Sequence, residues 1–275
     1  MLSDVAFGQY YPTESPVHRM DPRAKINFLI AYIVMIFIVK NFWGFLISGI
    51  FLSLAVAVSK VPLGSVLKSM KAILFLILFT FVLNVFFYES DENAVKLFWV
   101  VTDEGIYNAV FLALRLILLV MGSSVLTLTT TPVNLTDGIE SLLKPLKLIH
   151  FPVHELALIM SIALRFIPTL MDETERIIRA QKARGADFES GNLISRAKAL
   201  VPILIPLLIS AFRRAEELGD AMDARCYSGS SGRTKFKKLK FGYRDLIGLL
   251  IVAVSVTAVV LLNIYGINPI INLFK

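Results

Sequence analysis

The sequence has few of the residues that build disulfide frameworks or metal clusters, since its 275 residues contain one cysteine, Cys226. A single thiol excludes an internal disulfide framework and a thiolate cluster around structural zinc. A G-x-x-x-x-G-K-[ST] phosphate-binding loop is also missing. The nearest stretch, GSSGRTK at 229–235, has neither the spacing nor the ending of such a loop. The chain is therefore not expected to hydrolyse ATP by this route alone.

Charged residues are missing from long stretches of the chain. It is 56% hydrophobic with a mean hydropathy of +0.71, and a soluble domain this apolar would expose too much hydrophobic surface. A spanning helix needs about 20 mostly apolar residues. The shortest candidate spans only if Lys25 and Lys40 extend their ammonium groups to the two interfaces. The sequence predicts an all-α integral membrane protein with about five transmembrane helices, at 26–41, 42–59, 70–88, 106–130 and 244–266.

The distribution of basic residues predicts the orientation of these helices. The net charge of +7 could suggest a nucleic-acid partner, but in a membrane protein the placement of Lys and Arg matters more than their sum. An N-terminus in the cytoplasm puts all but four of the 28 Lys and Arg on the cytoplasmic side. The loop that begins at residue 88 is acidic by contrast. We therefore expect a multi-pass protein that contacts lipid and no nucleic acid, with a cytoplasmic N-terminus and an extracellular C-terminus. No cleavable signal peptide is predicted, because the first apolar run begins late.

The segment between residues 131 and 228 contains two further apolar stretches, 153–170 and 200–212. Lys and Arg flank each stretch at both ends, so a lone span would leave one basic flank on the wrong side. We interpret them as long amphipathic helices on the cytoplasmic side. The predicted organisation is a membrane region with four transmembrane helices at 1–130, cytoplasmic helices at 131–228, a linker at 229–243 and a C-terminal transmembrane helix at 244–275.

A short phrase, Ala-x-x-Ala-Arg followed by a small residue, occurs twice in this segment. The two alanines and the arginine share one face of a final helical turn, where small side chains allow close approach and a guanidinium offers a fork of donors. Arginine near a helix C-terminus also complements the macrodipole without any partner. Two copies at predicted cytoplasmic helix ends favour a binding role for Ala180, Ala183, Arg184 and Gly185, and for Ala221, Ala224, Arg225 and Cys226.

Four stretches together resemble a known family: AQKARG, AMDARC, the preceding ALRFIPTL and the N-terminal VHRMDPRAKI. They look like the T component (EcfT) of energy-coupling factor transporters, prokaryotic importers of vitamins and other micronutrients in the ATP-binding cassette superfamily. One departure is Cys226, which stands where glycine is often expected. Because the left-handed conformation is costlier for cysteine than for glycine, the second helix is expected to end differently.

The resemblance implies a non-catalytic scaffold in a prokaryotic cell membrane, with no cofactor of its own. Two cytoplasmic ATPase subunits would bind ATP and magnesium, and a separate S component would bind the substrate. Arg184 and Arg225 would each seat in a groove of one ATPase. The apolar faces of the same helices would hold the S component, through Leu200, Ile203, Leu204, Leu207, Leu208 and Phe212.

Other polar residues could point to a different function. Arg115 inside a span is costly unless paired, so it is expected to face the bundle and bond backbone carbonyls, with Asn84 as a candidate partner. His150 and His154 have metal-site spacing, but Pro152 interrupts the helix that would align them, so no metal site is predicted. A secondary transporter or a membrane-embedded enzyme remains as the alternative class, although the intramembrane ionisable groups or catalytic clusters that these need are scarce.

Overall fold

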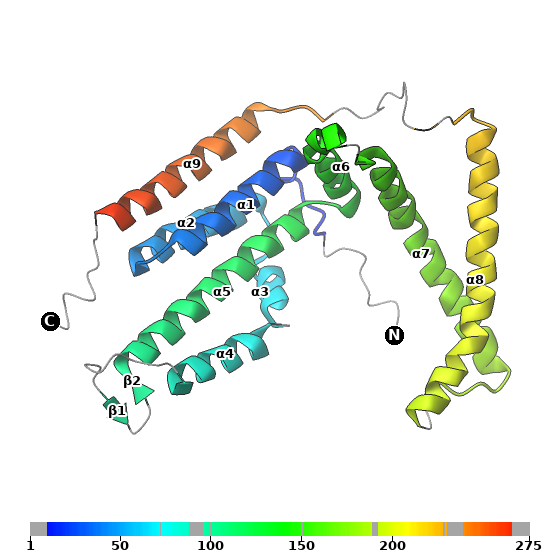
Figure 1. The fold of residues 1–275 in the computed structure, drawn as a ribbon, viewed down its shortest axis with the longest axis horizontal. Coiled ribbons are helices and arrows are strands. Elements are labelled where there is room, and N and C mark those ends of the chain that lie inside the picture. The colour runs from blue at the N-terminus through cyan, green and yellow to red at the C-terminus, as the bar shows by residue number, and fades with distance from the viewer. Residues whose placement is uncertain are drawn as a thin grey trace. The chain divides into compact units, whose positions relative to one another are not determined.

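The computed structural model describes residues 10–71, 73–87, 96–98, 101–149, 151–188, 192–227, 229 and 239–265. They form two compact units, one between Ile139 and Lys238 and the other from Gly8 to Gly138 together with Leu239 to Lys275. The second unit is a helical bundle, and the first is built mainly from two long helices (Figure 1). The predicted all-α membrane architecture is confirmed, with a small hairpin, β1 (Lys96–Phe98) and β2 (Val101–Thr102), as a minor addition.

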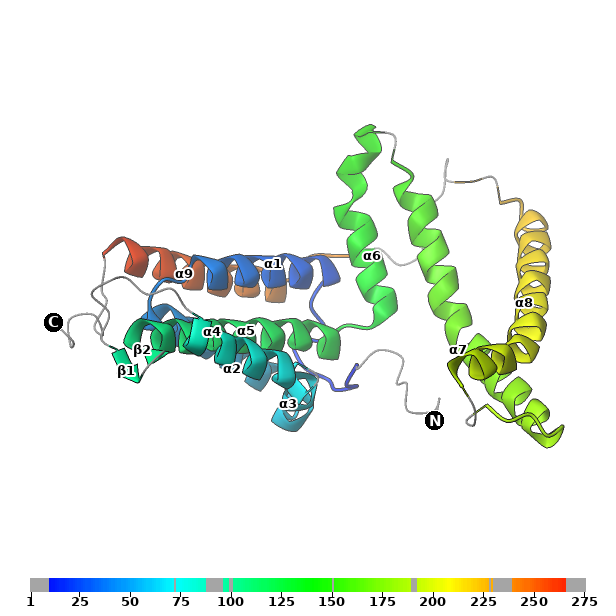
Figure 2. The ribbon, with the colours of Figure 1, turned by 60° about the horizontal axis from the view of Figure 1, so that its bottom comes forward.

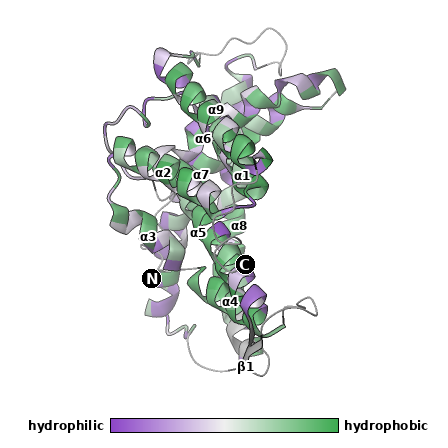
Figure 3. Ribbon diagram, turned by 90° about the vertical axis from the view of Figure 1, so that its left-hand side faces the viewer, coloured by the Kyte–Doolittle hydropathy of each residue, from purple (hydrophilic) through white to green (hydrophobic). Residues whose placement is uncertain are grey.

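Four helices lie side by side in the bundle: α1 (Pro22–Ile38), α2 (Phe42–Ser59), α5 (Asp103–Thr129) and α9 (Tyr243–Ile264) (Figure 2). Their core includes the buried side chains of Met35, Ile36 and Val259. Gly122 on α5 allows the close approach of α1, because a Cβ there would lie 2.2 Å from Cε1 of Tyr32. Hydrophobic colouring runs along α2 and α9 in Figure 3, which fits helices that face lipid on their outer side.

Most of the predicted spans are found close to their expected limits. The segment 42–59 matches α2 without change, 106–130 corresponds to α5 and 244–266 to α9. Helix α1 has 17 residues and begins four residues before the predicted segment 26–41, where the side chain of Asp21 accepts a hydrogen bond from the backbone nitrogen of Arg23 at 2.9 Å. Among the described residues, four helices are long and apolar enough to cross a membrane by length and composition, namely α2, α5, α7 and α9.

The span predicted at 70–88 falls on a bent helix pair, which by length and composition could still be one broken span. The structure has a short helix α3 (Leu63–Lys71), followed by α4 (Leu74–Phe87) at an angle of 60°. Fourteen residues of α4 rise only about 21 Å, less than the hydrocarbon core of a bilayer. Helix α3 is amphipathic, with Lys68 and Lys71 in its last turn, which explains why the apolar run does not continue through it.

The other unit contains a pair of 31-residue helices, α7 (Val153–Ala183) and α8 (Leu193–Asp223). Helix α6 (Pro132–Leu142) and a 3-10 turn (Lys144–Ile149) precede them, and the hydroxyl of Thr131 caps α6 by accepting a hydrogen bond from the nitrogen of Asn134. Because α7 also has the length and composition of a span, its placement on the cytoplasmic side stays a prediction based on flanking charge. Most of the predicted linker, 229–243, lies outside the described residues.

Candidate functional site

The first Ala-x-x-Ala-Arg phrase forms the C-terminal end of α7. Gly185, directly after the arginine, has a φ of +86°. Its backbone nitrogen donates to the carbonyl of Lys182 at 3.0 Å, and the nitrogen of Ala186 donates to the carbonyl of Gln181 at 3.0 Å. These are the two bonds of a Schellman helix end, which satisfies carbonyls that the helix itself leaves unpaired. The helix end thereby holds Arg184 on a defined terminal turn.

The second phrase forms the same structure at the end of α8. Cys226 has a φ of +55°, its nitrogen donates to the carbonyl of Asp223 at 2.8 Å, and the nitrogen of Tyr227 donates to the carbonyl of Met222 at 3.1 Å. The expectation that cysteine would change this helix end is wrong. Cysteine adopts the left-handed conformation that glycine adopts after Arg184, because the two closing hydrogen bonds require it.

All eight residues of the two phrases are exposed. The side chains of Arg184 and Arg225 have no hydrogen bond or ion pair with any residue that the structure describes. The guanidinium groups are therefore not used to stabilise this chain, and their donors are available to another molecule. The small alanine side chains beside them leave the terminal turns accessible.

The two ends lie at opposite ends of an antiparallel helix pair (Figure 1). Glu173 on α7 pairs with Arg214 on α8 at 3.3 Å, and Nε2 of Gln181 on α7 donates to the carbonyl of Pro202 on α8 at 3.4 Å. The first end is thus beside Pro202, and roughly 35 Å of helix separates Pro202 from the second end at Arg225. One groove could not hold both arginines, so the two guanidinium groups belong to two separate surfaces.

Proline explains the contact between Gln181 and α8. In a regular helix the nitrogen of residue 206 would donate to the carbonyl of residue 202, but Pro206 has no N–H. The freed carbonyl of Pro202 accepts the side chain of Gln181 instead. Figure 2 shows α8 bent in its first half, where these prolines lie. Gln181 therefore connects the first arginine phrase to the bend of α8. The sequence does not predict this hydrogen bond.

The apolar face predicted on α8 is mostly free. Ile203 is buried at 5% exposure and Leu207 is half-buried, so these two side chains are largely covered within the unit. The other four residues of the predicted face are about half exposed or more, and could contact a partner: Leu200, Leu204, Leu208 and Phe212.

Arg115 faces the bundle, as the sequence predicts. Its Nη2 donates to the carbonyl of Val39 at 3.0 Å, at the C-terminal end of α1, and its guanidinium lies 5.0 Å from the ring centre of Phe111. Asn84 does not take part in this network. Its Nδ2 donates to the carbonyl of Thr80 at 2.9 Å, within its own helix. Arg115 therefore has a structural role between helices.

Lys25 does not extend to an interface, so that part of the prediction is wrong. It is buried at 7% exposure, and its Nζ donates to the carbonyl of Thr129 at 2.9 Å and to Oγ1 of Thr130 at 3.1 Å. Asp245 lies at the same end of the bundle, where its carboxylate accepts hydrogen bonds from the nitrogens of Asp21 and Gly242. This polar cluster ties α1, α5 and α9 together. No local pattern in the sequence indicated it.

The histidine pair is only partly described, because His150 lies outside the described residues. Nδ1 of His154 is 3.4 Å from Oε1 of Glu140. Within the described part of the chain, no group of three His, Cys, Asp or Glu residues could hold a metal ion.

Several helices are long and apolar enough to cross a membrane, and three of them, α2, α5 and α9, pack with α1 in the bundle unit, which defines the chain as a multi-pass membrane protein. Comparisons with known proteins identify it further. A family model described as cobalt transport protein (CbiQ) matches residues 13–236. The chain is 52% identical over 268 residues to the energy-coupling factor transporter transmembrane protein EcfT of Clostridium kluyveri. The matched region covers 96% of this chain and 99% of the relative.

Two further relatives carry the same name. The EcfT of Ruminiclostridium cellulolyticum is 49% identical over 263 residues, which is 96% of this chain and 98% of the relative. That of Bacillus subtilis is 43% identical over 257 residues, which is 92% of this chain and 97% of the relative. The chain belongs to the family of energy-coupling factor transporter transmembrane proteins, and it is a transmembrane component of such a transporter.

Proposed function

We propose that this chain is the coupling scaffold of an energy-coupling factor importer. In this role, Arg184 and Arg225 dock on two cytoplasmic ATPase subunits, and the conformational change driven by ATP moves the helix ends relative to each other. The S component, which binds a vitamin or another micronutrient, contacts the exposed residues of the α8 face. The chain itself binds no nucleotide.

The single observation that carries this proposal is the matched pair of exposed helix ends. Two arginines without partners among the described residues, held by the same backbone hydrogen bonds and separated by most of the length of α8, suit two copies of a similar groove. A guanidinium forms paired, charge-assisted hydrogen bonds with a carboxylate or with carbonyl oxygens, so an acidic groove is the expected receptor. The basic flanks of α7 and α8 favour a cytoplasmic position for both ends.

The test is co-purification of the transporter from membranes that contain all subunits. We expect the double variant Arg184→Glu with Arg225→Glu to insert normally but to lose both ATPase chains and ATP-driven uptake, because each reversed charge repels an acidic groove. A matched double variant, Arg176→Glu with Arg213→Glu, changes exposed arginines of the same two helices away from their ends. It should retain the ATPases. Normal uptake in the first variant, or equal loss in both, would contradict the proposal.

The S-component contact is tested separately. We expect Leu204→Asp or Leu208→Asp to release the S component while the ATPases stay bound, because both side chains are more than half exposed and a buried carboxylate would disrupt an apolar contact. Loss of the ATPases before the S component would contradict this assignment.

A further inference from the structure

An apolar cavity of about 440 Å³ lies inside the bundle unit, apart from the arginine ends. It is bounded by α1, α2, α5 and α9 together with the segment that precedes α1. Its volume falls within the range of ~300–1,000 Å³ that is typical of small-molecule sites. Neither the family relationship nor the proposed coupling role assigns it an occupant.

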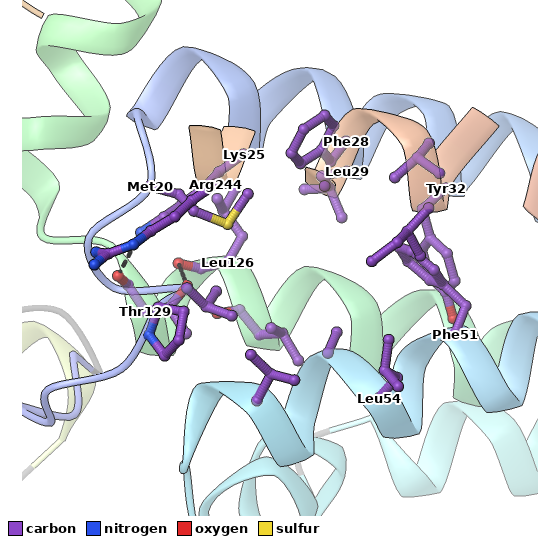
Figure 4. A pocket seen from close by; sticks show the side chains of 18 of the residues that line it. Met20, Lys25, Phe28, Leu29, Tyr32, Phe51, Leu54, Leu126, Thr129 and Arg244 are labelled. Carbon is purple, nitrogen blue, oxygen red and sulfur yellow. Dashed lines mark hydrogen bonds between the residues drawn. The ribbon is translucent and has the colours of Figure 1, made fainter. Parts of the chain in front are cut away.

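The cavity has a charged end and an apolar end. Figure 4 shows Lys25, Arg244 and Thr129 at one end, whereas Tyr32 and Phe51 lie at the other. Aliphatic side chains line most of the remaining wall, among them Leu29, Leu54, Ala55, Leu126, Ile247 and Ile251. This distribution of charged and apolar residues suits an amphiphilic ligand, which has one polar group and one apolar chain.

Arg244 supplies the available positive charge at this end. Its Nε donates to the hydroxyl of Tyr243 at 3.2 Å, and its two Nη groups have no hydrogen-bond partner among the described residues. Lys25 is occupied by Thr129 and Thr130. The nearby carboxylate of Asp245 is buried and accepts two backbone N–H groups, so it is not available to neutralise the Arg244 guanidinium directly.

The polarity of the cavity favours a lipid over a partner helix, because a lipid places one charged group and one apolar chain where the cavity has its charged and apolar ends. A flexible hydrocarbon chain can follow such a space, and it gains dispersion contacts with the apolar walls that an empty cavity lacks. In the orientation proposed above, the charged end faces the cytoplasmic leaflet, where anionic lipids are common, although the site itself does not rest on that orientation.

We propose that this cavity binds an anionic phospholipid, with an acyl chain along the wall of α2, α5 and α9 and the phosphate at Arg244. The two free Nη groups donate charge-assisted hydrogen bonds to the phosphate oxygens. The lipid fills the space between α2 and α9 that side chains leave empty, and it joins these helices at the end where α9 begins.

The experiment measures lipid binding to the full chain, purified with the proteins that accompany it, by native mass spectrometry. Dioleoyl phosphatidylglycerol and dioleoyl phosphatidylcholine are titrated as probes with identical chains. We expect the anionic lipid to bind about fivefold more tightly than the zwitterionic one, as is typical of one basic residue near a membrane surface. Arg244→Gln should remove this preference. Arg213→Gln, which changes an exposed arginine of α8, should not.

A second pair of variants tests the chain-binding part of the cavity. Ala55 lines the cavity, whereas Ala57 on the same helix is exposed and does not. We expect Ala55→Phe to weaken both lipids at least about fivefold by occupying the space of several CH₂ groups, and Ala57→Phe to change neither. Equal binding of the two lipids to the unmodified chain, or unchanged binding to Ala55→Phe, would overturn the proposal. Release of a protein subunit by Ala55→Phe without loss of lipid would assign the cavity to that protein. None of these results depends on ATPase docking.

Discussion

Gly185 and Cys226 occupy the same position in two separate helix ends, each directly after the arginine of its phrase and each with a positive φ. The hydrogen bonds around them match residue by residue, from Gln181 to Ala186 in one and from Met222 to Tyr227 in the other. The chain therefore keeps the geometry of the arginine end even where the residue type makes that geometry more costly.

The first prediction concerns this cost at the second end. A residue with a side chain is about 1–2 kcal/mol less stable than glycine in the left-handed region. We expect Cys226→Gly to slow hydrogen exchange of the closing amides at 226 and 227 by about fivefold, which corresponds to ~1 kcal/mol. Gly185→Ala should speed exchange of the amides at 185 and 186. Faster exchange in Cys226→Gly would show that the cysteine side chain stabilises the end by a contact of its own.

The second prediction concerns the independence of the two arginines. Sites with no shared contacts usually contribute additively to within about 0.5 kcal/mol. Because Arg184 and Arg225 lie at opposite ends of the helix pair, we expect Arg184→Ala and Arg225→Ala to weaken ATPase binding by amounts that add in the double variant. Binding of the purified ATPases to the chain in nanodiscs measures this. A coupling energy well above 0.5 kcal/mol would indicate that both ends contact one surface.

The third prediction isolates the contact between Gln181 and Pro202. We expect Gln181→Leu to destabilise the helix pair by about 0.5–1.5 kcal/mol, measured as local hydrogen exchange of α7 and α8. In a Pro206→Ala background the same change should have little effect, because the new N–H at residue 206 satisfies the carbonyl of Pro202. Pro202→Ala is the matched control, since it leaves that carbonyl without a helical donor. An equal effect of Gln181→Leu in all three backgrounds would rule out this explanation.

Features that depend on local sequence were predicted, whereas features that depend on packing between distant segments were not. The limits of α2, α5 and α9 were predicted to within three residues, because length and hydropathy alone determine where an isolated span ends. The break between α3 and α4 was missed, because hydropathy carries no signal for a change of direction. The lysines of α3 were the available indication.

The candidate functional residues also differ in whether local sequence or distant packing determines their surroundings. The two arginine phrases are local patterns, so the sequence was enough to place them on helix ends. Thr129 and Thr130, which accept hydrogen bonds from Lys25, are more than a hundred positions away along the chain, and only the packing of α1 against α5 brings them to it. The cavity beside Arg244 could not be predicted either, because it depends on where four helices leave space.

The fourth prediction compares the two polar residues of the membrane helices. Arg115→Leu removes the donor to the carbonyl of Val39, a residue that is fully buried, and should cost about 1–3 kcal/mol. Asn84→Leu removes only a bond within its own helix and should change stability by less than about 0.5 kcal/mol. The thermal midpoint of the purified protein in detergent measures both. A larger loss for Asn84→Leu would show that Asn84, and not Arg115, joins the helices.

The last prediction concerns pH and the segment that precedes α1. Nε2 of His18 donates to the carbonyl of Tyr11 at 3.1 Å, and its Nδ1 lies 2.7 Å from the hydroxyl oxygen of Ser15. Burial lowers the pKa of the imidazole below the usual 6.5. A lowered pKa means that the folded protein binds fewer protons than the unfolded chain between the two pKa values. The neutral ring therefore contributes stability above pH 6.5, and this contribution is lost as the pH falls through the folded pKa.

The measurement is the thermal midpoint as a function of pH for the unmodified chain and for His18→Gln. We expect the unmodified chain to be the more stable of the two above pH 6.5, and the difference between them to shrink as the pH falls below that value. The remaining ionisable groups are the same in both proteins and cancel in the difference. A difference that grows on acidification would mean that His18 is stabilised in its charged form, and that burial is not the dominant influence on its pKa.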